Sequence, residues 1–111
     1  MIQNIGIDIL ENKRIEKSIN DDFLNMTLTK KELEIYNSKK GKKKLEFLCG
    51  RIACKEAIIK CLNEVENPHY LELEILNKEN GAPYTVYKNY NIKISISHEN
   101  NYTIAQAIFL K

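Results

Sequence analysis

The residues best suited to chemistry in this sequence are Asp8, Glu56, Lys60 and His98, which come from three distant parts of the chain. Glu56 and Lys60 are four positions apart, so on a helix both head groups can reach one ligand. Helical spacing also places Glu56 among apolar side chains, where a bare carboxylate is costly and must be paired, protonated or bound to a metal. A plain helical ion pair between Glu56 and Lys60 is the alternative interpretation.

Asp8 belongs to an N-terminal segment, residues 2–10, whose alternation predicts a strand. On such a strand Ile5, Ile7 and Ile9 face one way, and Asp8 stands on the other face, the one not built for the core. Aspartate is uncommon inside strands, so Asp8 needs a reason beyond solvation, and Gly6 beside it leaves room for another group to approach.

A single long helix is predicted from about Lys42 to Leu62, a segment with no proline and one glycine. Its apolar residues form two stripes on nearly opposite sides. One stripe surrounds Glu56, and the other contains Phe47, Cys54, Ile58 and Cys61. A small chain has little left to cover the second stripe after a sheet covers the first, which predicts an oligomer.

The other elements are short. Residues 11–18 are compatible with a short helix, and Phe23, Leu24, Met26 and Leu28 are expected in a turn region. Thr29 and Glu32 form a capping box that opens a helix to about Asn37. Alternation predicts strands at 70–76, 84–87, 92–98 and 102–110. The expected fold is α+β, with an N-terminal strand, short helices and one long helix packed on an antiparallel sheet, in a single domain over residues 1–111.

Composition excludes several classes of protein. Apolar residues make up 43 % and charged residues 29 % of the chain, as in soluble globular domains. A net charge of +2 is too weak to indicate nucleic-acid binding. No apolar run could cross a bilayer and no signal-peptide pattern is present. Three cysteines without CxxC spacing predict free, buried thiols and a cytoplasmic location.

Several motifs, in this order and in a chain this short, resemble the holo-acyl-carrier-protein synthases of the phosphopantetheinyl transferase family. They are Gly6-Ile7-Asp8-Ile9 with Glu11 and Arg14-Ile15, Leu28-Thr29 with Glu32, the segment Phe47–Ala57, Asn80-Gly81-Ala82-Pro83, and Ser95-Ile96-Ser97-His98. The resemblance implies transfer of the phosphopantetheine arm of coenzyme A to a serine of apo acyl carrier protein. Adenosine 3′,5′-bisphosphate is then the by-product, and fatty acid biosynthesis the context.

The resemblance also implies roles for individual residues. Asp8 and Glu56 would hold Mg²⁺, a hard cation that prefers carboxylate, phosphate and water oxygens. Lys60 would contact phosphate. The nucleotide of coenzyme A would lie along Asn80, Gly81, Pro83, Ser97 and His98. The group that accepts the serine proton stays open between a metal-bound water and Glu56.

Docking and assembly follow from the same resemblance. Lys13, Arg14 and Lys17 would dock the acidic carrier protein, although Asp21 and Asp22 follow closely. The family is typically trimeric with each site between two protomers, which predicts a homotrimer. Ala82 replaces a lysine that is common in the family, so one cation toward the nucleotide is missing.

Two other functions compete with this one. A small basic nucleic-acid-binding module would use the lysine-rich segment 39–44 and the tyrosines, with salt-sensitive affinity and no need for magnesium. An inactive transferase-like subunit would only bind a carrier protein, and would not need Asp8, Glu56 and Lys60. The lysine-rich segment is either a solvated loop or a phosphate-attracting patch. Arg51 is open between phosphate binding and pairing with an acid such as Glu46.

Overall fold

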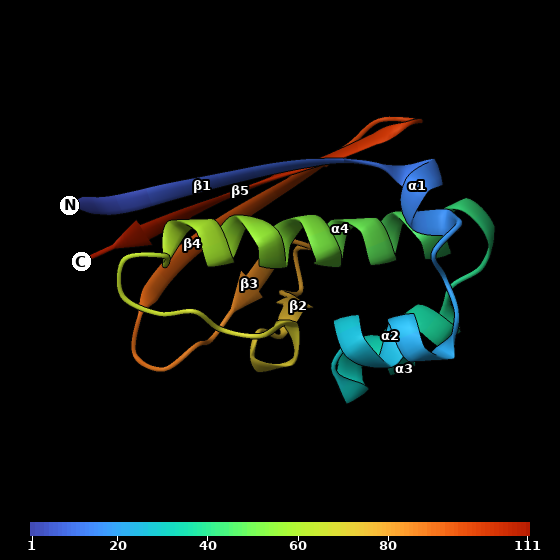
Figure 1. Cartoon of the computed structure of the whole chain (residues 1–111), viewed down its shortest axis with the longest axis horizontal. Coiled ribbons are helices and arrows are strands. Elements are labelled where there is room, and N and C mark those ends of the chain that lie inside the picture. The colour runs from blue at the N-terminus through green and yellow to red at the C-terminus, as the bar shows by residue number, and fades with distance from the viewer.

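One long helix, α4 (Gly41–Cys61), lies along an antiparallel sheet in the computed structural model, which describes residues 1–111 (Figure 1). The sheet has the strand order β1-β5-β4, formed by β1 (Ile2–Glu11), β5 (Tyr102–Leu110) and β4 (Asn91–His98). The predicted α+β class, with a long helix packed on an antiparallel sheet, is confirmed.

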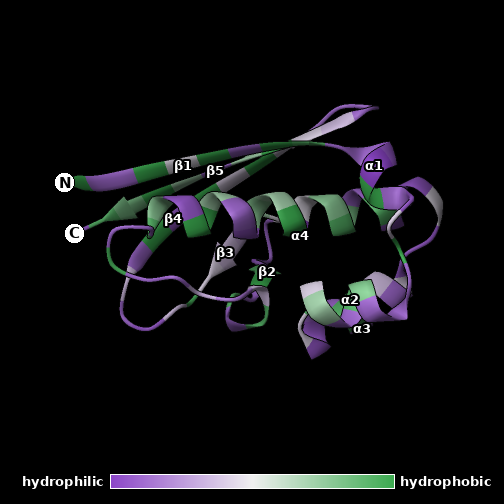
Figure 2. Ribbon diagram, in the orientation of Figure 1, coloured by the Kyte–Doolittle hydropathy of each residue, from purple (hydrophilic) through white to green (hydrophobic).

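The other side of α4 is covered by short elements of the same chain (Figure 1). They are α1 (Asn12–Glu16), α2 (Asp21–Thr27), α3 (Lys30–Ser38), the 3₁₀ turn η1 (Tyr70–Glu72) and the hairpin of β2 (Ile75–Asn77) and β3 (Pro83–Thr85). Hydrophobic residues recur along most of α4 (Figure 2), and Cys54, Ile58 and Cys61 of the second apolar stripe are all buried. The second apolar stripe therefore needs no other subunit, and that argument for an oligomer is wrong.

Strand β1 packs on the helix with the face that carries Gly6 and Asp8. A Cβ atom on Gly6 would lie 2.0 Å from the carbonyl oxygen of Ala57, so only glycine allows this close approach. Ile5, Ile7 and Ile9 point away from the helix and stay 58 to 60 % exposed. The group that approaches Gly6 is thus helix α4, and the isoleucines build an outer apolar face.

Local signals explain most element boundaries. The predicted capping box is present, because the Thr29 hydroxyl accepts from the Glu32 N–H and Glu32 accepts from the Thr29 N–H. Residues 21–27 form α2 rather than a turn, since the Asn20 side chain caps them by accepting from the Phe23 N–H at 2.8 Å. The predicted strand 70–76 is wrong in its first half, which is the 3₁₀ turn η1.

The two ends of the chain lie side by side at one end of the sheet (Figure 1). Ile2 pairs with Leu110, and the Lys111 N–H donates to the Met1 carbonyl at 3.0 Å. Strand β5 lies between β1 and β4, so the last strand of the chain joins the first to the sheet. No helix is long and apolar enough to span a membrane, and all three cysteines are free and buried.

Candidate active site

Asp8 and Glu56 line one pocket of about 310 Å³ between β1, α4 and the short helices. Asp8 reaches it because it lies on the helix-facing side of β1, opposite Ala105 of β5. Glu56 comes from the middle of α4 and is partly buried. Arg14, Thr27 and Tyr70 complete the polar part of the lining. The structure thus brings together two acids that are 48 positions apart in the sequence.

Lys60 lies beside Asp8 and does not pair with Glu56. Its ammonium group donates to the Ile7 carbonyl at 2.9 Å and to Asp8 Oδ1 at 3.3 Å. The Lys60 side chain remains 52 % exposed, so an incoming anion can reach its charge. A helical Glu56–Lys60 pair, the plain alternative from the sequence, is not formed.

Tyr70 is the hydrogen-bond partner of Glu56, and sequence reasoning missed it. The Tyr70 hydroxyl donates to Glu56 Oε1 from the turn η1. Burial, followed by the Glu56 carboxylate, raises the pKa of Tyr70, so the hydroxyl keeps its proton. The signal in the sequence was weak, because a tyrosine at the start of an alternating segment is typical of a strand residue.

Two carboxylates meet in the pocket, and only Asp8 has an ion pair, with Lys60. Burial raises the pKa of Asp8, Lys60 opposes this effect, and Glu56 adds to it by repulsion between the two carboxylates. A divalent cation would relieve that repulsion, and two carboxylates with room for water and phosphate form the oxygen-rich set that Mg²⁺ accepts. The residues present therefore fit the cation that the resemblance implies.

The hairpin that carries Asn80, Gly81 and Pro83 lies apart from this pocket. Gly81 has a φ of +90°, which favours glycine, and Asn80 Oδ1 accepts from the Ala82 N–H at 3.0 Å. Asn77 braces the turn by donating to the Gly81 carbonyl at 2.8 Å. Pro83 lines a second pocket, of about 380 Å³, against β4.

Arg51 contacts this hairpin from helix α4. Its guanidinium donates to Asn77 Oδ1 and lies 4.1 Å from the ring centre of Phe47. Burial lowers the pKa of Arg51. The structure gives it no ion pair with Glu46, and Arg51 supports the Asn80–Pro83 turn through Asn77.

Ser97 and His98 end β4 on opposite faces of the sheet. Ser97 is exposed on the outer face beside Ile104, whereas His98 is in the helix-facing row with Thr103. The His98 ring packs over Gly50, where a Cβ atom would lie 3.2 Å from His98 Cε1. Neither residue lines the Asp8–Glu56 pocket, so one chain holds the predicted site residues as two separate groups.

Of the predicted docking residues, Arg14 is the one at the pocket. It extends from α1 into the lining, and its charge lowers the pKa of Asp8 slightly against the effect of burial. Lys13 and Lys17 are exposed on or next to the same short helix. The three residues give α1 and the residue after it positive charge, of which Arg14 brings one to the pocket.

Comparison with known proteins now identifies the family. The model of the 4′-phosphopantetheinyl transferase superfamily matches residues 4–107. This chain belongs to that superfamily. A holo-[acyl-carrier-protein] synthase of Mycoplasma mycoides is 43 % identical over 97 % of this chain and 94 % of its own length. One from a Geobacillus species is 41 % identical over 97 % and 96 % of the two chains.

Solved structures of transferases with the same name share the fold. A crystal structure of a holo-(acyl-carrier-protein) synthase from Bacillus anthracis in complex with CoA (3′,5′-ADP) has a TM-score of 0.89 and 36 % identity, covering 98 % of this chain and 96 % of that one. A Helicobacter pylori synthase in complex with coenzyme A has a TM-score of 0.81 and 27 % identity, covering 96 % and 99 %. The resemblance inferred from the motifs is confirmed.

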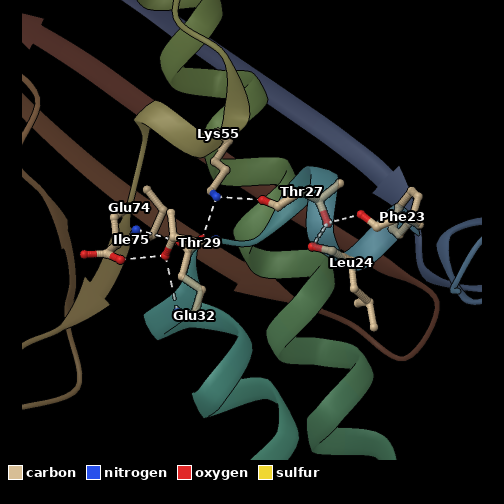
Figure 3. A network of polar contacts seen from close by, with 8 residues as sticks. All are labelled: Phe23, Leu24, Thr27, Thr29, Glu32, Lys55, Glu74 and Ile75. Carbon is tan, nitrogen blue, oxygen red and sulfur yellow. Dashed lines mark hydrogen bonds and ion pairs between the residues drawn. The ribbon is translucent and has the colours of Figure 1, made fainter. Parts of the chain in front are cut away.

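A second acid–lysine pair of this phosphopantetheinyl transferase lies next to the pocket and was missed (Figure 3). Lys55 Nζ contacts Glu32 Oε1 at 2.6 Å and donates to the Thr27 carbonyl at 2.7 Å, and both side chains are fully buried. Glu32 also accepts from the N–H groups of Thr29 and Ile75, at 2.8 and 2.7 Å. This network ties α3, α4 and β2 together and leaves no face open to a ligand.

Proposed function

We propose that this chain transfers the 4′-phosphopantetheine arm of coenzyme A to a serine of apo acyl carrier protein, in a magnesium-dependent reaction that releases adenosine 3′,5′-bisphosphate. The observation that carries the proposal is the meeting of Asp8 and Glu56 in one pocket, with the exposed ammonium of Lys60 beside it. Relatives named for this activity match almost the whole chain.

The side chains of the pocket have complementary tasks. Asp8 and Glu56 would hold the cation, while Lys60 would meet phosphate charge at the exposed edge. Mg²⁺ held by Asp8 and Glu56 would supply positive charge to the pyrophosphate. The serine oxygen would form the new bond to the phosphorus that carries the arm and give its proton to Glu56 or a water molecule. The bond from that phosphorus to the bridging oxygen would break, and the bridging oxygen would leave with the nucleotide. Arg14, with Lys13 and Lys17, would attract the acidic carrier toward the pocket.

We also propose that the active site is shared between subunits of a homotrimer. Coenzyme A would extend from the Asp8–Glu56 pocket of one protomer to His98 and the Asn80–Pro83 turn of the next. Two observations support this arrangement: these groups lie apart within one chain, and the outer sheet face exposes Ile5, Ile7 and Ile9. An exposed apolar face of this kind is typical of subunit interfaces.

The reaction is tested by mass spectrometry of apo carrier protein after incubation with coenzyme A and Mg²⁺. A mass gain of one phosphopantetheine arm, lost when the metal is chelated, is the expected result. Glu56→Gln serves as the inactive control. A folded protein that produces no mass gain with any acidic carrier protein would contradict the proposal, and an equal gain under chelation would contradict the metal requirement.

The shared site is tested by mixing two inactive variants, Asp8→Asn and His98→Ala. Reassembly of the mixture creates interfaces at which both residues are intact, so part of the activity should return. Native mass spectrometry verifies that hybrids form. Hybrids that show no recovered activity, or a stable monomer that is fully active, would show that each chain carries its own site.

We further propose that the protein works in the cytoplasm. The three cysteines are free and buried, which agrees with a reducing compartment. Cell fractionation with an antibody against the chain tests this location.

A further inference from the structure

A buried chain of hydrogen bonds runs from α1 to His98. Thr103, fully buried on β5, contacts His98 Nδ1 through its hydroxyl at 3.1 Å. The same hydroxyl donates to Asn12 Oδ1 at 2.8 Å, and Asn12 is only 4 % exposed. None of the catalytic roles above uses Asn12 or Thr103, although two buried polar residues in one contact need a reason.

The orientation of Asn12 is determined by the turn between β4 and β5. Its side-chain Nδ2 faces the carbonyl oxygens of Glu99 and Asn100, at 3.4 and 3.5 Å, and its backbone N–H donates to the Asn101 carbonyl at 2.9 Å. Carbonyl oxygens only accept, so the amide nitrogen must face the turn and Oδ1 must face Thr103. Asn12 therefore presents an acceptor to Thr103.

The number of available protons determines which ring nitrogen of His98 carries a proton. The Thr103 hydroxyl has one proton, which it donates to Asn12 Oδ1. The contact between His98 Nδ1 and the Thr103 oxygen can be a hydrogen bond only if Nδ1 carries a proton of its own. The reverse arrangement would leave the buried Asn12 Oδ1 without a donor, which is costly.

We propose that Asn12 and Thr103 are positioning residues that hold neutral His98 as its Nδ1–H tautomer, with Nε2 kept as a hydrogen-bond acceptor. Nε2 has no partner within the chain, and the ring is exposed over Gly50. Because Nδ1 already carries the proton, Nε2 is the ring atom that meets the nucleotide, either as an acceptor or, after binding a second proton, as a donor to an anionic oxygen. This substrate consequence rests on the proposed function, whereas the tautomer does not.

The tautomer is tested by two-bond ¹H–¹⁵N correlation spectra of the histidine rings in the intact protein at a pH of about 8.5, well above the ordinary histidine pKa of about 6.5. The chain has only two histidines, and exposed His69 is the internal reference. The expected His98 pattern has the proton on Nδ1. A pattern with the proton on Nε2 in the unaltered protein would overturn the proposal without any variant.

Two variants separate positioning from packing. Thr103→Val keeps the shape but removes the hydroxyl, so the His98 pattern should lose its Nδ1–H character, while Thr103→Ser should retain it. The double variant Asn12→Leu with Thr103→Val removes both polar partners and guards against instability from an unpaired Asn12. An unchanged His98 pattern in folded Thr103→Val would overturn the proposal.

Coenzyme A binding, measured by calorimetry, tests the substrate consequence. Thr103→Val should weaken it about tenfold, the scale of one lost hydrogen bond, whereas Thr103→Ser should bind like the unaltered protein. His98→Ala should weaken coenzyme A binding at least as much as Thr103→Val. A folded Thr103→Val protein that binds coenzyme A as tightly as the unaltered protein would overturn the substrate consequence. An unaltered protein that binds no coenzyme A would contradict the proposed function, while the tautomer result would stand.

Discussion

Lys55 and Glu56 are neighbours on α4, yet their surroundings differ in nearly every respect. Lys55 is fully buried and bonded to Glu32 and to the Thr27 carbonyl, and its acid partner holds two backbone N–H groups as well. Glu56 has one hydrogen bond, from Tyr70, and it faces the acid Asp8 across a pocket. A helix turns by about 100° per residue, so adjacent residues can serve separate environments.

The difference between the two sites distinguishes a stabilising ion pair from a site that can bind a ligand. In the Lys55–Glu32 network the buried charges are satisfied within the chain, and burial, opposed by Glu32, lowers the pKa of Lys55. In the pocket the charges are only partly satisfied, and burial and repulsion raise the pKa of Asp8. Unbalanced charge beside open space is what a cation or a phosphate can complete.

The largest effect is expected from Glu56→Gln, which should change the transfer rate strongly and the stability very little. The change should lower the transfer rate about a thousandfold, because it removes a charge that the reaction needs while leaving the shape of the pocket. The melting temperature should stay within a few degrees of the original, measured by circular dichroism alongside the mass-spectrometric rate. A large loss of stability would erase the distinction between the two sites.

Lys55→Met should lower the stability and leave the transfer rate nearly unchanged, the reverse of Glu56→Gln. Removing one partner of a buried pair leaves Glu32 as an uncompensated carboxylate, so the free energy of unfolding should fall by about 3 kcal/mol. Urea denaturation measures this loss. The transfer rate per folded molecule should change only a few-fold at low temperature. If activity is lost without any fall in stability, Lys55 belongs to the reacting groups and the comparison fails.

Tyr70→Phe tests whether the hydrogen bond to Glu56 supports metal binding in the pocket. The ring is kept and only the hydroxyl that donates to Glu56 is removed, so the Mg²⁺ concentration for half-maximal rate should rise about tenfold. Tyr87→Phe is the matched control, since it removes a hydroxyl that contacts the distant Glu66 at 3.4 Å. Equal behaviour of the two variants would show that the Tyr70 hydroxyl does not support the site.

The smallest effect is a pH dependence of stability. Because the pKa of Asp8 is raised above its ordinary value of 3.8 in the folded chain, its ionisation destabilises the fold as the pH rises through that folded pKa. The free energy of unfolding of Asp8→Asn, relative to that of the original protein, should therefore be higher at about pH 7 than at about pH 3. These two pH values lie on either side of the range in which Asp8 ionises. Urea denaturation midpoints of both proteins at the two pH values measure this difference. A variant that is relatively less stable at the higher pH would contradict the prediction.

Much of the fold follows from local signals in the sequence. The long helix was predicted at 42–62 and spans Gly41–Cys61, and the strand predicted at 102–110 has the observed bounds. The Thr29 capping box was recognised because both of its partners lie within four residues. Period and capping depend on near neighbours, so a single sequence can reveal them.

Apart from the 3₁₀ turn at 70–72 and the helix at 21–27, the errors concern contacts between distant segments. Alternation in residues 2–10 separates two faces but does not say which one packs, and the close approach of Gly6 to Ala57 decides it. For the same reason the Lys55–Glu32 pair, 23 positions apart, had no local signal. Asp8 and Glu56 were singled out by local patterns and their shared metal role came from the resemblance, but their common pocket depends on the packing of β1 against α4.

The pairing of the first strand with the last has a consequence for how the protein is made. Strand β1 pairs with β5 alone, from Ile2 with Leu110 to Glu11 with Tyr102. During synthesis β1 leaves the ribosome well before β5, its only partner in the sheet. The strand that carries Asp8 therefore joins the sheet only after β5 has emerged. Contacts of such long sequence separation also slow folding.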